Sequence, residues 1–193
     1  MKTIYYSANK CQKWDVTSYK TKGGFGSVYQ ACCETDCNYI IKEIFPVDSD
    51  SFKNEVKIHR KLSKKQIAPK IYDAWMDDNN GFIVMDKMTT TLKQYLKIHR
   101  RLSSSKLYEV FMTINIMHEN GVQHNDLHSS NIMLNDSKNI YIIDFGKSIL
   151  KKKLDKKERL DDYVDLLGLS EWDDVNRQEI QDYIYRHFSI MIQ

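Results

Sequence analysis

The sequence lacks several features that would assign the protein to particular classes. No apolar stretch approaches the roughly 20 residues of a membrane-spanning helix, and the first ten residues lack the apolar run of a signal peptide. We therefore expect an intracellular, cytoplasmic protein without a membrane-bound part. The chain has only two prolines and seven glycines, and no internal repeat or Pro/Gly/Ser-rich linker divides it. This excludes a repeat array and domains joined by a flexible linker.

Charge and cysteine are also limited. Lys and Arg exceed Asp and Glu by only three, which is too small an excess to argue for nucleic acid as a partner. The four cysteines are expected to be reduced thiols, because the protein is expected to be intracellular. A bound metal is the alternative for Cys32, Cys33 and Cys37, but their spacing is not that of a paired-cysteine zinc site.

The first half of the sequence is typical of strands. Alternating or β-branched residues predict strands, a turn rich in Asp and Asn predicts a hairpin, and helical spacing behind a Ser/Asp cap predicts one helix. The expected strands are Trp14–Lys20, Ser27–Cys32, Tyr39–Ile44, Ile71–Met76 and Phe82–Asp86, and the expected helix is Ser49–Ser63.

The second half is mainly helical. The expected helices are Thr91–His99, Ser103–Asn120, Leu160–Leu169 and Asp173 to about Ile190, the last behind a capping box at Ser170–Asp173. Two short strands, Ile132–Leu134 and Ile140–Ile143, lie between them. The change of pattern predicts an α+β chain with two lobes, residues 1–86 and 87–193, which together form a single domain.

Glycines and one lysine in the first half indicate phosphate binding. Gly23, Gly24, Phe25 and Gly26 form a turn before Val28, and glycine lets a backbone approach phosphate oxygens, although ordinary hairpin turns use the same residues. Lys42 interrupts an apolar strand, where an ammonium needs an anion. An ion pair with Glu55 would hold it against the α- and β-phosphates of a nucleotide, and a solvated edge lysine is the alternative.

The most informative segment is His124–Asn131, followed by Asp144-Phe145-Gly146. Asp126, Asn131 and Asp144 offer hard oxygen atoms of the kind that bind Mg²⁺ together with phosphates. Phosphoryl transfer requires mainly positioning and neutralisation of charge. We therefore expect Asp126 to orient an attacking hydroxyl and accept its proton, and Asn131 and Asp144 to hold the metal.

In this order, the motifs resemble those of the protein kinase superfamily. The resemblance runs from about Trp14 to Gly168. It implies a two-lobed kinase-like fold, with a β-rich N-lobe containing one main helix and a truncated, mainly helical C-lobe. It also implies ATP and Mg²⁺ as cofactors, with Ile83–Met88 as the strand and hinge that receive adenine. The implied ATP-binding residues are Gly23, Gly24, Phe25, Gly26, Val28, Ile40, Lys42, Met85, Asp86, Met88 and Met133.

Departures from the family pattern indicate an atypical member. Asn125 replaces the usual Arg, so control through a phosphorylated activation loop is not expected. His128 replaces the Lys near the transferred phosphate and is similar to the His of aminoglycoside kinases. The segment after Gly146 has no Ala-Pro-Glu motif and is short, as in Bud32-type kinases and small kinases of large DNA viruses or bacterial effectors, which would act in a host cell. By the same resemblance, Asp162 is expected to support the catalytic loop.

The resemblance implies an ATP- and Mg²⁺-dependent Ser/Thr protein kinase, with Asp126, Lys42, Glu55 and His128 as its catalytic residues. A small-molecule phosphotransferase of the aminoglycoside- or choline-kinase type is one alternative. A nucleotide-binding pseudokinase or scaffold is another, disfavoured because every phosphate and metal position holds a competent residue. The basic segment Lys151–Lys157 is expected to attract an acidic protein substrate or RNA, and a solvated loop is the alternative. A partner protein is also expected.

Overall fold

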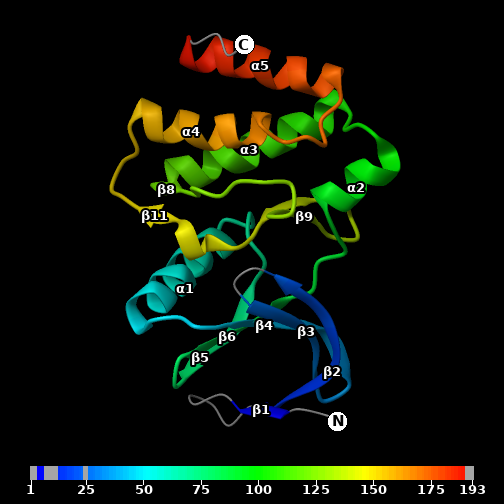
Figure 1. Cartoon of the computed structure of the whole chain (residues 1–193), viewed down its shortest axis with the longest axis vertical. Coiled ribbons are helices and arrows are strands. Elements are labelled where there is room, and N and C mark those ends of the chain that lie inside the picture. The colour runs from blue at the N-terminus through cyan, green and yellow to red at the C-terminus, as the bar shows by residue number, and fades with distance from the viewer. Residues whose placement is uncertain (1–3, 7–12, 24–25, 190–193) are drawn as a thin grey trace. The chain divides into compact units, whose positions relative to one another are not determined.

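The computed structural model describes residues 4–6, 13–23 and 26–189. They form the predicted α+β fold (Figure 1). Contacts group the chain into two compact units. Unit 1 consists of Met1–Lys64 and Pro69–Lys87, and unit 2 consists of Lys65–Ala68 and Met88–Gln193.

Unit 1 contains an antiparallel sheet in which the described strands lie in the order β1-β2-β3-β4-β6-β5. Their bounds are β1 (Ile4–Tyr6), β2 (Lys13–Gly23), β3 (Gly26–Cys33), β4 (Asp36–Ile44), β5 (Ile71–Asp77) and β6 (Asn80–Asp86). All five predicted strands are confirmed, with ends that differ by up to three residues. The pairing of β1 with β2 was not predicted from the sequence.

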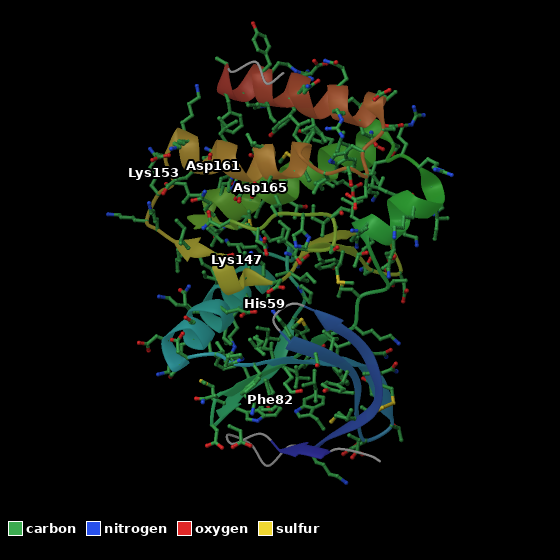
Figure 2. The ribbon with its side chains drawn as sticks, in the orientation of Figure 1. His59, Phe82, Lys147, Lys153, Asp161 and Asp165 are labelled. Atoms are coloured by element: carbon green, nitrogen blue, oxygen red, sulfur yellow. A yellow bond between two sulfur atoms is a disulfide. The ribbon has the colours of Figure 1, made fainter. Side chains whose placement is uncertain are left out.

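Both faces of this sheet are apolar, because successive residues of a strand point to opposite sides. On β6, Phe82 and Val84 pack with Trp14 and Trp75 on one face, and the rings of Trp75 and Phe82 are stacked with centroids 5.1 Å apart (Figure 2). Ile83, the residue between Phe82 and Val84, packs on the other face with the helix α1. The central strands are therefore held from both sides.

The helix α1 (Ser49–Ser63) has the predicted bounds. It starts after Asp48, whose carboxylate accepts hydrogen bonds from the N–H groups of Asp50 and Ser51. Its buried face includes Glu55 among apolar residues, and it also includes His59, whose Nε2 donates to the carbonyl of Pro69 at 2.9 Å (Figure 2). Glu55 is thereby turned toward the interior of unit 1.

The cysteines differ from the prediction. Cys32 and Cys37 form a disulfide across the turn between β3 and β4, with Cα atoms 4.0 Å apart, while Cys33 has a free thiol. The prediction of reduced thiols is therefore wrong for this pair, because the hairpin brings two strand ends together that sequence spacing alone does not pair. Cys11 lies outside the described residues. Within the described residues, no group of three or more His, Cys, Asp and Glu side chains could hold a metal ion.

Unit 2 contains four α-helices among its described residues. Three of them, α3, α4 and α5, lie near one another in Figure 1. The helices are α2 (Leu92–His99), α3 (Ser104–Glu119), α4 (Lys156–Leu167) and α5 (Asp174–Phe188). The strand β9 (Ile132–Leu134) pairs with β7 (Thr90–Thr91) and β10 (Ile140–Ile142). A second small sheet pairs β8 (Val122–Gln123) with β11 (Ile149–Leu150), and the 3₁₀ helix η1 (Phe145–Lys147) precedes β11.

The helices α2 and α3 start one residue later than predicted, after the N-caps Thr91 and Ser103, and the starts of α4 and α5 differ for other reasons. The helix α4 starts four residues early, because Asp155 caps it and forms a capping box with Glu158. The N-cap of α5 is Asp173, which accepts from the N–H of Asn176 at 2.8 Å, so the capping box predicted from Ser170 is wrong. No described helix is both long and apolar enough to cross a membrane.

Candidate active site

In unit 1, β4 and α1 bring Lys42 and Glu55 together. The Nζ atom of Lys42 lies 2.8 Å from Oε1 of Glu55, and the two side chains are 15% and 5% exposed. A carboxylate this buried is costly without a cation, so the pair satisfies both groups. An ammonium has three donor hydrogens, which leaves Lys42 able to bind a further acceptor such as a phosphate oxygen.

The glycine-rich turn has a structural requirement of its own. Gly23 at the end of β2 pairs with Gly26 at the start of β3, while Gly24 and Phe25 lie outside the described residues. A Cβ atom on Gly26 would lie 1.9 Å from the carbonyl oxygen of Glu43 on β4. Strand packing therefore excludes any side chain at this position, whether or not the turn binds phosphate.

The other residues of the predicted ATP-binding set in unit 1 lie on adjacent strands. Val28 pairs with Lys42, and Ile40 pairs with Met85. Asp86 ends β6, and its carboxylate accepts from the N–H of Lys70 and from the Tyr72 hydroxyl. Burial and this hydrogen bond raise the pKa of Tyr72 to about 12. The Asp86 carboxylate is thus used within unit 1. In unit 2, Met88 and Met133 are half-buried, and Met133 lies on β9.

In unit 2, the loop that carries Asp126 is bound to α4. Asp162 of α4 is fully buried, and its carboxylate accepts from the N–H groups of His124 and Asn125 at 3.0 Å. It also lies 2.8 Å from Nε2 of His118 on α3. A carboxylate with this many donors fixes the loop backbone firmly. This is the supporting position that the family resemblance implied for Asp162.

His124 ties the same loop to the segment that precedes Asp144. Its Nε2 donates to the carbonyl of Ile143 at 3.0 Å, and its ring packs against Phe145. Burial lowers the pKa of His124, and its Nδ1 is buried without a hydrogen-bond partner. The side chain therefore acts as a neutral donor within the core of unit 2.

Asp126, His128 and Asn131 lie together on the loop, as predicted. The Nδ2 of Asn131 donates to the main-chain oxygen of Asp126 at 3.0 Å and lies 3.1 Å from Nε2 of His128. Because both amide hydrogens are used in this way, the amide oxygen is the atom that can reach a cation. Nε2 of His128 lies 3.9 Å from Oδ2 of Asp126.

Asp144 follows closely in space. The N–H of Ile143 donates to the carbonyl of Asn131 at 3.0 Å, which brings the next residue, Asp144, beside Asn131. Asp144 has left-handed backbone angles, φ 66° and ψ 68°, and stands directly before η1, with no capping hydrogen bond from its side chain to that helix. A carboxylate and an amide oxygen fit Mg²⁺, which keeps waters and shares phosphate oxygens instead of requiring three protein carboxylates.

The structure adds two residues that were not predicted from the sequence. Lys147, labelled in Figure 2, lies on η1, and its Nζ is 3.0 Å from Oδ1 of Asp126. Asp165, one turn after Asp162 on α4, interacts with the N–H of Leu127, and burial together with the charge of Asp162 raises its pKa. The sequence signal for Lys147 was its place directly after Asp-Phe-Gly, whereas no signal pointed to Asp165.

Comparison with known proteins shows the family. Residues 21–167, more than half of the chain, match the protein kinase domain. Serine/threonine-protein kinase RIM15 of Saccharomyces cerevisiae is 24% identical over 76% of this chain and 9% of its own length. A probable serine/threonine-protein kinase of Clostridium acetobutylicum is 30% identical over 64% of the chain and 20% of its own length. The B1 kinase of vaccinia virus is 26% identical over 69% and 52%.

The chain thus spans about half the length of the viral relative and much less of the other two. The match to the domain nevertheless includes Lys42, Glu55, the loop of Asp126 and Asp144. The chain belongs to the protein kinase family.

Proposed function

We propose that the protein is an ATP- and Mg²⁺-dependent kinase that phosphorylates Ser or Thr side chains of other proteins, as a minimal, atypical member of its family. The observation that carries this proposal is the loop in which Asp162 fixes the backbone of His124 and Asn125, directly before Asp126. A positioned carboxylate is the main requirement for aiming a hydroxyl at a phosphorus atom. The similarity to serine/threonine-protein kinases of yeast and Clostridium supports Ser or Thr as the acceptor.

In the proposed reaction, the acceptor oxygen forms a bond to the γ-phosphorus of ATP. The bond from that phosphorus to the β–γ bridging oxygen breaks, and ADP leaves with the electron pair. Asp126 accepts the hydroxyl proton. Lys42, held by Glu55, neutralises the α- and β-phosphates. Asn131 and Asp144 would hold Mg²⁺, which supplies positive charge to the phosphate oxygens when bound.

Nucleotide binding is proposed for the remaining residues of the predicted set: Gly23, Gly24, Phe25, Gly26, Val28, Ile40, Met85, Asp86, Met88 and Met133. His128 is proposed to act beside Asp126, through its contact with Asn131. The assignment of residues 1–86 to an N-lobe and 87–193 to a C-lobe also belongs to this proposal, as does a cytoplasmic site of action.

An acidic protein substrate is proposed because of a cavity in unit 2 where basic residues outnumber acidic ones. The cavity, of about 680 Å³, is lined by Lys153, Lys156, Arg159 and His187 and by one acidic residue, Asp155, whose side chain caps α4 (Lys153 in Figure 2). The Nε atom of Arg159 is buried without a hydrogen-bond partner, which favours an anionic ligand. Lys151, in contrast, is paired with Glu158. The predicted role of Lys151–Lys157 is therefore proposed for Lys153 and Lys156 rather than for the whole segment.

The test is transfer of labelled phosphate from ATP to acidic and to basic acceptor proteins. Replacing Asp126 or Asp144 by Ala should lower the rate by about 10² to 10⁴, because a positioned acid–base group or a metal ligand is lost. Asp174→Ala, an exposed residue of the first turn of α5, is the matched control and should transfer at the wild-type rate. Lys153→Glu with Lys156→Glu should raise KM for the acidic acceptor and not for ATP.

A small-molecule phosphotransferase is the second candidate, favoured by His128. It would be supported by transfer to an aminoglycoside or to choline without transfer to any protein. Nucleotide binding without transfer to either kind of acceptor would contradict both proposals and support a scaffold. Equal rates for wild type and Asp144→Ala would contradict the metal assignment.

A further inference from the structure

The turn after Asp144 brings a lysine to the proposed proton acceptor. Nζ of Lys147 lies 3.0 Å from Oδ1 of Asp126, and the two side chains are 50% and 26% exposed. An ion pair this exposed contributes little to folding stability, because solvent screens its charges. Its consequence is therefore to be sought in the placement of the Asp126 carboxylate and not in the stability of unit 2.

The backbone of Lys147 is fixed to the loop of Asp126 at neighbouring points. Its carbonyl accepts from Nδ2 of Asn125 at 3.2 Å. The next residue, Ser148, donates through Oγ to the carbonyl of His124 at 3.2 Å, and β11 then pairs with β8. Because both ends of the ion pair lie on segments bonded to each other, the backbone of Lys147 is fixed within reach of Asp126.

The imidazole of His128 is not suited to the same task. Its Nδ1 faces the N–H of Ser130 at 3.3 Å, and its Nε2 faces Nδ2 of Asn131 at 3.1 Å. Both neighbours are donors, and an imidazole that accepts from Asn131 does so through the ring nitrogen that carries no proton. In this arrangement the ring serves as an acceptor that orients Asn131, and Lys147 brings the positive charge.

We propose that Lys147 is a positioning residue for phosphoryl transfer: its ammonium binds Oδ1 of Asp126 and thereby directs Oδ2 toward the acceptor hydroxyl. This inference rests on the proposed function. By the family resemblance, a lysine is expected at the position of His128. The inference assigns the positive charge of that lysine to Lys147 on η1. Lys147 acts through Asp126, so its removal should affect the chemical step and leave nucleotide binding intact.

The test compares Lys147→Met, Lys147→Arg and a matched control, Lys106→Met. Lys106 also forms an ion pair, with Glu109 at 2.7 Å within α3. Lys147→Met should lower kcat by roughly 10 to 10², as expected for loss of a group that orients a general base, with KM for ATP changed less than about threefold. Lys147→Arg should restore most of kcat. Lys106→Met should match wild type, and thermal unfolding should show that all three variants fold.

A double-variant comparison separates positioning from a direct effect. The double variant Asp126→Asn, Lys147→Met should have nearly the same residual rate as Asp126→Asn alone. The effects of two residues that act as one unit are not additive. A full additional loss would overturn the inference, and so would an unchanged kcat in Lys147→Met or a failure of Arg to restore it. If the wild-type protein transfers no phosphate, the proposed function fails. If the wild-type protein transfers phosphate but Lys147→Met has the same kcat, only the inference about Lys147 fails.

Discussion

The two units hold their proposed reactive groups in different ways. In unit 1, Lys42 and Glu55 come from a strand and a helix, and their side chains meet in an ion pair. In unit 2, Asp126 lies on a loop whose backbone is bonded to Asp162 and whose neighbour Asn131 binds its carbonyl. The first arrangement depends on the reactive pair itself, whereas the second depends on residues that need not touch a substrate. Substitution of a reactive residue in unit 1 should therefore mainly lower activity, whereas substitution of a supporting residue in unit 2 should mainly lower the free energy of unfolding.

The largest effect is expected for Asp162→Ala in unit 2. The change leaves the buried N–H groups of His124 and Asn125 and the ring of His118 without their acceptor. Loss of one partner from a buried charged network costs about 3–5 kcal/mol of unfolding free energy. Urea denaturation measures it. The control is Asp161→Ala, one residue earlier and exposed, which should change stability by less than about 0.5 kcal/mol (Figure 2). Equal stabilities would show that the loop does not depend on α4.

A smaller stability effect with a clear loss of function is expected for Lys42→Met in unit 1. Without the ammonium, Glu55 loses its ion-pair partner Lys42 while only 5% exposed. Transfer of labelled phosphate should fall by about 10² to 10³, as for removal of one charge-stabilising group. The double variant Lys42→Met, Glu55→Gln should recover stability but not activity, since neutral replacement of both partners relieves the buried charge.

Lys57→Met, on the exposed side of α1, serves as its control and should keep wild-type activity. If the double variant regained activity together with stability, the Lys42–Glu55 pair would be structural only, and the contrast between the units would disappear.

The smallest effect concerns pH and His124. Its pKa is lowered by burial from the ordinary value of 6.5, so below that pH the unfolded chain binds a proton that the folded chain does not. The contribution of His124 to stability is thus complete above pH 6.5 and declines as the pH falls toward the lowered pKa. Chemical denaturation between pH 7.5 and 5 should show a decline that is weaker in His124→Gln, by at most about 1.4 kcal/mol per pH unit. Identical slopes would contradict the assignment.

Much of the fold could be predicted from the sequence because it depends on local patterns. Periodicity located α1 with its observed bounds and every strand of unit 1 except β1. Helix starts were predicted less accurately. A charged first turn such as that of α4 has no apolar periodicity, and its start is set by the capping aspartate Asp155. The Cys32–Cys37 disulfide could not be predicted, because it depends on the exact turn that joins two strands.

The same distinction applies to the site. The spacing of Asp126, Asn131 and Asp144 located the loop, and the pairing of Lys42 with Glu55 follows the family order. The packing requirement at Gly26 depends on the approach of Glu43 on a neighbouring strand, which no motif records. Lys147 reaches Asp126 across 21 residues, through a turn that only the folded backbone defines.

Two residues of the site have backbone angles that most L-amino acids avoid. Asn125 and Asp144 have φ values of 61° and 66°, a region that costs an ordinary residue about 1–2 kcal/mol and glycine almost nothing. Glycine at either position would relax the backbone, but it would remove the amide that binds Lys147 or the carboxylate proposed to hold Mg²⁺. Selection of variants for thermostability alone would thus be expected to enrich glycine at positions 125 and 144, and the most stable of these proteins would be the least active.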